Sequence, residues 1–177
     1  MKMNIANQLT ILRIILIPFF IYFLLAGQLA IAFIFFLLAS FTDFLDGYLA
    51  RKHHLITNFG KFMDPLADKL LITSAMICFV ELGMLNSWVV ILIISREFIV
   101  SIFRAIAAAE GIVIAASWWG KAKTISQMIM VIILLLNNYP FSLLNLPVDQ
   151  ISIYVATILT VVSGYDYIVK NKQVLKE

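Results

Sequence analysis

The sequence predicts an all-α membrane protein with six transmembrane helices. Of its 177 residues, 63% are hydrophobic and only 13% are charged, and the mean hydropathy is +1.01. A soluble globular domain has about 25% charged residues, so the composition excludes that class. We expect a single domain over residues 1–177 that contacts membrane lipids and binds no nucleic acid.

The first three apolar segments each approach the roughly 20 residues that a helix needs to cross a bilayer. Residues 9–26 form the first segment, which ends at the pair Gly27-Gln28. Residues 29–50 form the second, and the polar stretch 52–60 separates it from the third, residues 63–81. Glycine and clustered polar residues favour turns, so these breaks predict helix ends.

The last three apolar segments follow the same rule. Residues 87–109 form the fourth, which ends where Gly111 begins a more polar stretch. Residues 122–138 form the fifth, and residues 149–169 form the sixth. Pro140 lies in the connection between them, where a helix cannot easily continue.

The N-terminus and the basic residues predict an orientation. Residues 1–8 are polar enough to form a short helix along the membrane surface. Basic residues gather at the N-terminus, in the second-to-third and fourth-to-fifth connections and at the C-terminus, whereas the other three connections have none. Because Lys and Arg concentrate in cytoplasmic segments, we expect a multi-pass protein of the cell membrane with both termini and its active site cytosolic.

Four aspartates interrupt segments that otherwise consist mainly of Leu, Ile, Phe and Ala. Ionisable side chains at membrane depth are costly and are functional candidates by default. Asp43 and Asp46 are three residues apart and Asp64 and Asp68 are four apart, so each pair shares one face of its helix. The second and third segments are antiparallel through a cytosolic connection, which brings both pairs to a similar depth. Such close carboxylates cannot all stay ionised unless a strong positive charge joins them.

A divalent cation is the candidate for that positive charge. Oxygen ligands without His or Cys favour Mg²⁺ or Mn²⁺, with Ca²⁺ as an alternative. Four carboxylates exceed what one Mg²⁺ usually takes from a protein, which favours two ions that clamp a phosphoryl transfer. We expect Asp68 to act as general base for an incoming hydroxyl, because it lies deepest in the third segment. Gly47 and Ala50 remove bulk beside the acids, which allows either close approach of another helix or the approach of a ligand.

Two other interpretations of the acids stay open from the residues alone. Intramembrane aspartates also form salt bridges, here with Arg51 or Lys69, or serve as ion relays in cation-coupled transporters. A transporter would place its binding groups near the midplane, often with repeats or broken helices. The acids lie toward one side and the sequence has no visible repeat, which favours an enzyme. A plain helix-bundle scaffold would leave the acids without a purpose.

Residues 43–68 read Asp-x2-Asp-Gly-x2-Ala-Arg-x8-Gly-x3-Asp-x3-Asp, which resembles the signature of the CDP-alcohol phosphotransferase family at every fixed position. The resemblance implies a six-span protein, usually a homodimer, that uses divalent metal to displace CMP from a CDP-linked lipid with an alcohol. It implies that the four aspartates hold metal and that Asp68 activates the acceptor hydroxyl. It also implies a cytidine diphosphate pocket at Asp43, Gly47, Ala50, Arg51 and Gly60.

Cationic side chains in the fourth and fifth segments bear on the acceptor alcohol. Arg96 and Arg104 are close to two helical turns apart and share a face, and Arg suits phosphate recognition. Lys121 and Lys123 open the fifth segment, where helix N–H groups also attract anions. Together they could hold a second phosphate, which glycerol 3-phosphate carries and choline or serine does not. The alternatives are an ion pair of Arg96 with Glu97 and a plain cytosolic basic loop for the lysines.

These cationic residues are similar to those of phosphatidylglycerophosphate synthases within that family. The stretch Asn4-Ile-Ala-Asn7-Gln-Leu-Thr10-x2-Arg13 is similar too, with Ala6 where the family usually has Pro. The resemblance implies that Asn7 and Thr10 lie near the nucleotide. It implies that the acceptor phosphate is held by Arg96, Arg104, Lys121 and Lys123.

The expected reaction follows from both resemblances. The phosphatidyl group of CDP-diacylglycerol would pass to glycerol 3-phosphate, giving phosphatidylglycerol phosphate and CMP. Phosphatidylglycerol, serine or inositol phosphate are alternative acceptors for the same chemistry.

Overall fold

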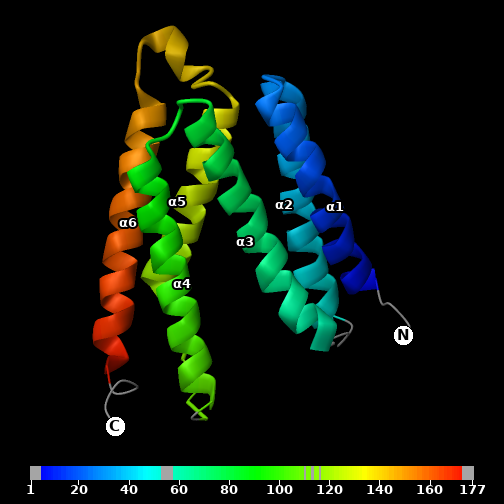
Figure 1. The fold of residues 1–177 in the computed structure, drawn as a ribbon, viewed down its shortest axis with the longest axis vertical. Helices are drawn as coiled ribbons and strands as arrows, with labels where there is room; N and C mark the ends of the chain where they lie inside the picture. Colours follow the sequence, from blue (N-terminus) through cyan, green and yellow to red (C-terminus); the bar gives the residue numbers. More distant parts are fainter. Residues whose placement is uncertain (1–4, 53–57, 110, 113, 116, 173–177) are drawn as a thin grey trace. The chain divides into compact units, whose positions relative to one another are not determined.

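The computed structural model describes residues 5–52, 58–109, 111–112, 114–115 and 117–172. These residues form six α-helices and no β-strand, so the all-α prediction is confirmed for them. Figure 1 labels the helices as α1 (Ile5–Leu25), α2 (Leu29–Lys52), α3 (Asn58–Glu81), α4 (Ser87–Ala109), α5 (Trp118–Leu135) and α6 (Val148–Lys170), and a short 3-10 helix, η1 (Phe141–Leu144), precedes α6.

Each predicted apolar segment corresponds to one helix. The bounds of α4 are the predicted ones, and α3 begins at residue 58 rather than at 63. The predicted surface helix over residues 1–8 is wrong for residues 5–8, because α1 runs without a break from Ile5 to Leu25. At the start of this helix Asn7 is buried, whereas the next residue, Gln8, is exposed. Residues 1–4 lie outside the described part of the chain.

Glycines end the helices where the sequence predicted breaks. After α1, Gly27 has a φ of 74°, and the Gln28 N–H donates to the Phe23 carbonyl over 2.9 Å. After α4, Gly111 has a φ of 75°, and the Ile112 N–H donates to the Ala107 carbonyl over 2.8 Å. Around a glycine in the left-handed conformation, such hydrogen bonds pair backbone carbonyls of the last helical turn, which have no partner within the helix.

Two helices in the described part of the chain are long and apolar enough to cross a membrane. They are Asn7–Leu25, with a mean hydropathy of 2.1, and Val148–Lys170, with a mean hydropathy of 1.4. The apolar part of α2, Leu29–Asp43, is shorter. Charged side chains inside α3 and α4 lower the hydropathy of those helices. Six helices are therefore observed, and six crossings stay a prediction.

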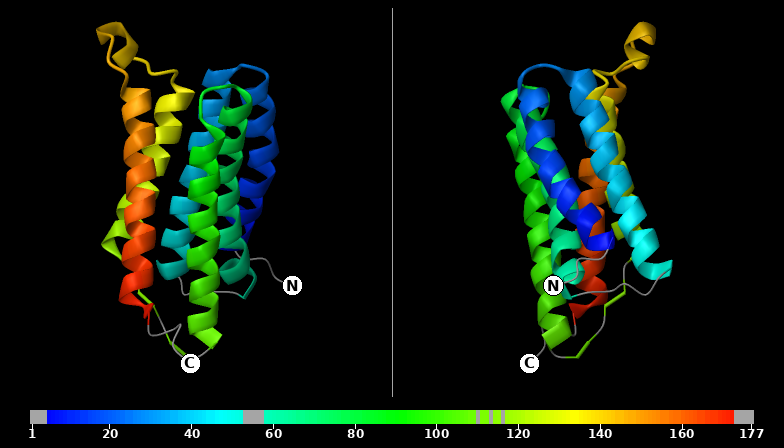
Figure 2. Two further views of the ribbon diagram at one scale, coloured as in Figure 1. Left: turned by 60° about the vertical axis from the view of Figure 1, so that its left-hand side comes forward. Right: turned by 90° about the vertical axis from the view of Figure 1, so that its right-hand side faces the viewer.

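The chain divides into two compact units, and the first contains α1, α2 and α3. In this unit α1 packs along α2 and also contacts α3 (Figures 1 and 2). Phe20 and Phe36 are fully buried at the centre of the α1–α2 contact, with ring centroids 5.8 Å apart. Ala39 and Ala67 are also fully buried, and such small side chains let helices approach closely.

The second unit contains α4, most of α5, η1 and α6. Here α4 packs against α6, and Val100, Phe103 and Ala107 form a buried cluster with Tyr167. The Gln127 side chain of α5 donates to the Thr160 hydroxyl of α6 over 3.1 Å, and both groups are buried. These contacts fix the faces that α4, α5 and α6 present to one another.

Candidate active site

The polar side chains of α1 form a buried row. Asn7, Thr10 and Arg13 follow one another at intervals of three residues, so they lie on one side of the helix. Thr10 and Arg13 are fully buried, and Asn7 is nearly so. Because α1 packs on both α2 and α3, this row meets the two helices that carry the signature aspartates.

Each of two signature aspartates contacts one member of that row. Arg13 Nη1 lies 2.8 Å from Asp43 Oδ1, and the Thr10 hydroxyl donates to Asp64 Oδ1 over 2.6 Å. The Asp43 and Asp64 carboxylates are close enough to repel each other. The prediction that carboxylates of the second and third segments come to a similar depth is therefore confirmed for this pair.

The structure describes the other signature residues only in part. Asp68 lies one turn after Asp64 on α3 and is partly buried, and Gly60 is buried near the start of α3. The backbone of α2 includes Asp46, Gly47, Ala50 and Arg51, but the surroundings of these residues lie outside the described part of the structure.

The carboxylates that the structure describes are chemically suited to a hard divalent cation. Asp43 and Asp64 come from different helices, supply only oxygen atoms and repel each other unless a cation joins them. Their described contacts both use Oδ1, so Oδ2 of each can serve as a ligand. No group of three or more His, Cys, Asp or Glu side chains gathers among the described residues. With Asp46 outside them, they supply only part of the predicted ligand set.

The predicted acceptor-phosphate residues lie in the second unit, and two of them share a counter-ion. Arg96 Nη1 lies 3.1 Å from Glu97 Oε1, and the Lys123 amine contacts the same oxygen. The ion pair of Arg96 with Glu97, which the sequence left as an alternative, is therefore present. Arg96 Nε is buried and has no hydrogen-bond partner in the part of the chain that is described. The three side chains carry a net positive charge and retain a donor for an anion.

Arg96 and Arg104 both face α6, so the prediction that they share a face is confirmed. Gly164 leaves room for Arg96, because a Cβ at that position would lie 3.1 Å from Arg96 Cγ. Arg104 Nε donates to the Tyr167 hydroxyl over 3.2 Å, and its guanidinium carbon lies 5.4 Å from the centre of that ring. Within the described residues, Arg104 is thus held by an aromatic side chain rather than by Glu97.

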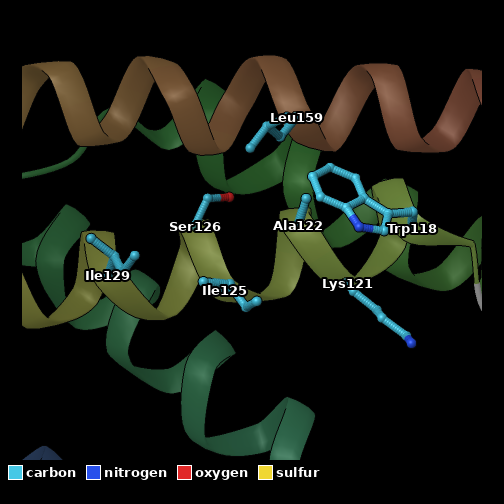
Figure 3. Close-up of a pocket in the computed structure, with 7 residues that line it drawn as sticks. All are labelled: Trp118, Lys121, Ala122, Ile125, Ser126, Ile129 and Leu159. Atoms are coloured by element: carbon cyan, nitrogen blue, oxygen red, sulfur yellow. The ribbon is translucent and has the colours of Figure 1, made fainter.

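Two hollows lie beside these cationic residues. A cavity of about 260 Å³ between α4 and α6 is lined by Arg96 and Gly164 together with apolar side chains. A larger groove of about 430 Å³ lies between α5 and α6, and Figure 3 shows Ile125, Ile129 and Leu159 along it. The amine of Lys121 points away from Leu159 in that view.

The sequence profile of the CDP-alcohol phosphatidyltransferase family matches residues 3–162. The chain belongs to this family. The matched range includes the whole signature, the α1 row and every predicted acceptor residue.

Named relatives cover nearly the whole chain. A CDP-diacylglycerol–glycerol-3-phosphate 3-phosphatidyltransferase of Bacillus subtilis is 46% identical over 98% of this chain and 97% of its own length. Proteins with the same name from Rickettsia felis and Haemophilus influenzae are 40% and 42% identical, over 93% and 95% of this chain and 93% of their own lengths. This member of the family is therefore similar, along nearly their full lengths, to relatives that carry the same activity in their names.

Sequence reasoning assigned no role to three residues that the structure places at these sites. Arg13 contacts a signature aspartate, Glu97 joins two cations, and Tyr167 holds Arg104. A signal for Arg13 was available, because polar residues at intervals of three inside an apolar helix indicate a buried polar face. Glu97 was considered only as a partner of Arg96, since no pattern within one helix predicts its contact with Lys123.

Proposed function

We propose that this chain transfers the phosphatidyl group of CDP-diacylglycerol to glycerol 3-phosphate, giving phosphatidylglycerol phosphate and CMP. The proposal rests on the contacts by which two adjacent turns of α1 hold Asp43 and Asp64, the carboxylates of two different signature helices. It is supported by relatives that carry the name of this activity along nearly their full lengths.

In the proposed reaction a hydroxyl of glycerol 3-phosphate attacks the phosphorus that carries diacylglycerol. A new P–O bond forms as the anhydride bond to CMP breaks, and CMP leaves with the electron pair. The hydroxyl proton passes to the Asp68 carboxylate, which acts as general base. Asp68 suits this role because it is partly buried, one turn away from Asp64.

Divalent metal belongs to the same proposal. Asp43, Asp46, Asp64 and Asp68 would hold Mg²⁺ or Mn²⁺, and the number of carboxylates favours two ions. When bound, the ions would neutralise charge on the diphosphate and on the leaving oxygen. The buried hydrogen bond from Thr10 would keep the Asp64 carboxylate oriented.

We assign a separate set of residues to each substrate. The proposed nucleotide-binding residues are Asn7, Thr10, Asp43, Gly47, Ala50, Arg51 and Gly60. The acceptor phosphate would bind to Arg96 and Lys123, with Arg104 and Lys121 as further cations. The buried Nε of Arg96 supports this assignment, because a buried donor without a partner gains most from an anionic ligand.

We also propose that the six helices form one membrane domain over residues 1–177, with both termini and the active site cytosolic. Many large apolar side chains are exposed along the helices, among them Tyr22, Phe98 and Ile158. Exposed apolar surface of this extent indicates contact with lipid or with another protein. Assembly as a homodimer would cover part of that surface.

The test is CMP release from CDP-diacylglycerol by the purified chain. We expect release to require both glycerol 3-phosphate and Mg²⁺ or Mn²⁺, and Asp68→Asn to slow it by about 10²–10⁴-fold. Asp149→Asn is the matched control, because it removes a carboxylate at the start of α6, outside the signature. Phosphatidylglycerol, serine and inositol phosphate are offered in parallel. If CMP release with one of these alcohols is as fast as with glycerol 3-phosphate or faster, that alcohol is the acceptor instead.

A further inference from the structure

Arg13 is the largest fully buried charged side chain in the described residues, and the proposed reaction gives it no task. It lies in the middle of α1, among Leu and Ile residues. A buried charge is unfavourable unless a partner compensates for it. The partner is Asp43 Oδ1, 2.8 Å from Arg13 Nη1.

The two members of this ion pair differ in exposure. The Arg13 side chain is 0% exposed, whereas that of Asp43 is 42% exposed. The guanidinium is therefore fixed inside the unit, while the Asp43 side chain stays partly accessible. A carboxylate that is held by a buried cation and is still partly exposed is suited to bind a ligand.

The neighbouring carboxylate is held in the same way from the same helix. Thr10, one turn before Arg13, is fully buried and donates its hydroxyl proton to Asp64 Oδ1 over 2.6 Å. Two adjacent turns of α1 thus each fix one oxygen of one signature aspartate.

We propose that Arg13 is a positioning residue for the divalent-metal site, which it serves by orienting the Asp43 carboxylate. Groups that orient metal-binding carboxylates usually contribute 10–100-fold to metal affinity, on the order of the effect expected here. The inference rests on the proposed function, because it assumes that Asp43 binds the metal.

The experiment measures Mn²⁺ binding to the purified full-length protein without substrates. Free Mn²⁺ is followed by electron paramagnetic resonance in detergent micelles, for the unchanged protein and for Arg13→Gln, Arg13→Lys and Asp43→Asn. Lys170→Gln is the matched control, because Lys170 Nζ lies 2.7 Å from Asp166 Oδ1 in an ion pair outside the signature.

We expect Arg13→Gln to weaken Mn²⁺ binding about 10–100-fold and Lys170→Gln to leave it unchanged. Arg13→Lys should weaken it less, because the ammonium keeps the charge but loses the planar guanidinium. Binding by Arg13→Gln that is equal to or tighter than that of the unchanged protein would overturn the inference. Tighter binding is the result expected if Arg13 contributed only a repelling positive charge.

Two further outcomes separate this inference from the proposed function. If the unchanged protein binds no Mn²⁺, or if Asp43→Asn binds it equally well, the proposed metal site itself fails. If Arg13→Gln does not fold, Arg13→Lys decides the question. Unchanged Mn²⁺ affinity in a folded Arg13→Lys protein would then overturn the positioning role.

Discussion

Removing the Glu97 carboxylate should destabilise the second unit strongly. Glu97 is the described counter-ion of both Arg96 and Lys123, whose side chains are only 12% and 5% exposed. Breaking a buried ion pair by removing one partner costs about 3–5 kcal/mol. The Glu97 side chain is 23% exposed, so water can replace part of the lost interaction. We therefore expect Glu97→Ala to lower the free energy of unfolding by about 3 kcal/mol, the lower end of that range.

The assay is equilibrium unfolding in mixed micelles, followed by tryptophan fluorescence. Glu81→Gln is the matched control, because it removes an exposed carboxylate at the end of α3 and should change the free energy by less than about 0.5 kcal/mol. A double-mutant cycle of Glu97→Gln with Lys123→Met should give a coupling of about 0.5–3 kcal/mol. Strictly additive effects would show that the contact between these side chains contributes nothing, which would refute the reasoning. Glu97→Gln should also raise the KM for glycerol 3-phosphate more than that for CDP-diacylglycerol.

Other changes test the two sites separately. Asp68→Asn should lower the turnover number by about 10²–10⁴-fold while metal-dependent CDP binding persists, since an amide cannot accept the hydroxyl proton; equal losses in both measurements would contradict a base role. Gly164→Ala should push the Arg96 stem and raise the KM for glycerol 3-phosphate several-fold in initial-rate assays, because the new Cβ would lie 3.1 Å from its Cγ. Thr10→Val should lower the free energy of unfolding by about 1.5–3 kcal/mol with chelator present, whereas Thr10→Ser should retain the hydrogen bond to Asp64 and most of the stability. Chelation should abolish CMP release and added Mn²⁺ should restore it, and activity that survives chelation would exclude a metal-dependent reaction.

The local features of the fold were predictable because they depend on short stretches of chain. Apolar runs of about 20 residues predicted six helices, and left-handed glycines such as Gly27 and Gly111 end helices at predicted breaks. The start of α1 was mispredicted because composition marks residues 1–8 as polar without showing that Asn7 faces protein.

The relative positions of candidate site residues were most predictable where both residues lie on the same helix. The eight-residue spacing of Arg96 and Arg104 predicted that they share a face, and both lie against α6, beside Gly164 and Tyr167. The sequence also predicted that acids of the second and third segments lie at a similar depth, and Asp43 and Asp64 contact two adjacent turns of α1.

The sequence alone determined which helices form and which charged side chains share a face, because helical periodicity is a property of each segment. Only the tertiary structure decided that Arg13 holds Asp43, that Thr10 holds Asp64 and that Glu97 joins Arg96 to Lys123. Such contacts depend on how far each helix is rotated about its axis and shifted along its neighbour. Packing of small and large side chains between helices sets both quantities, and no single segment encodes them.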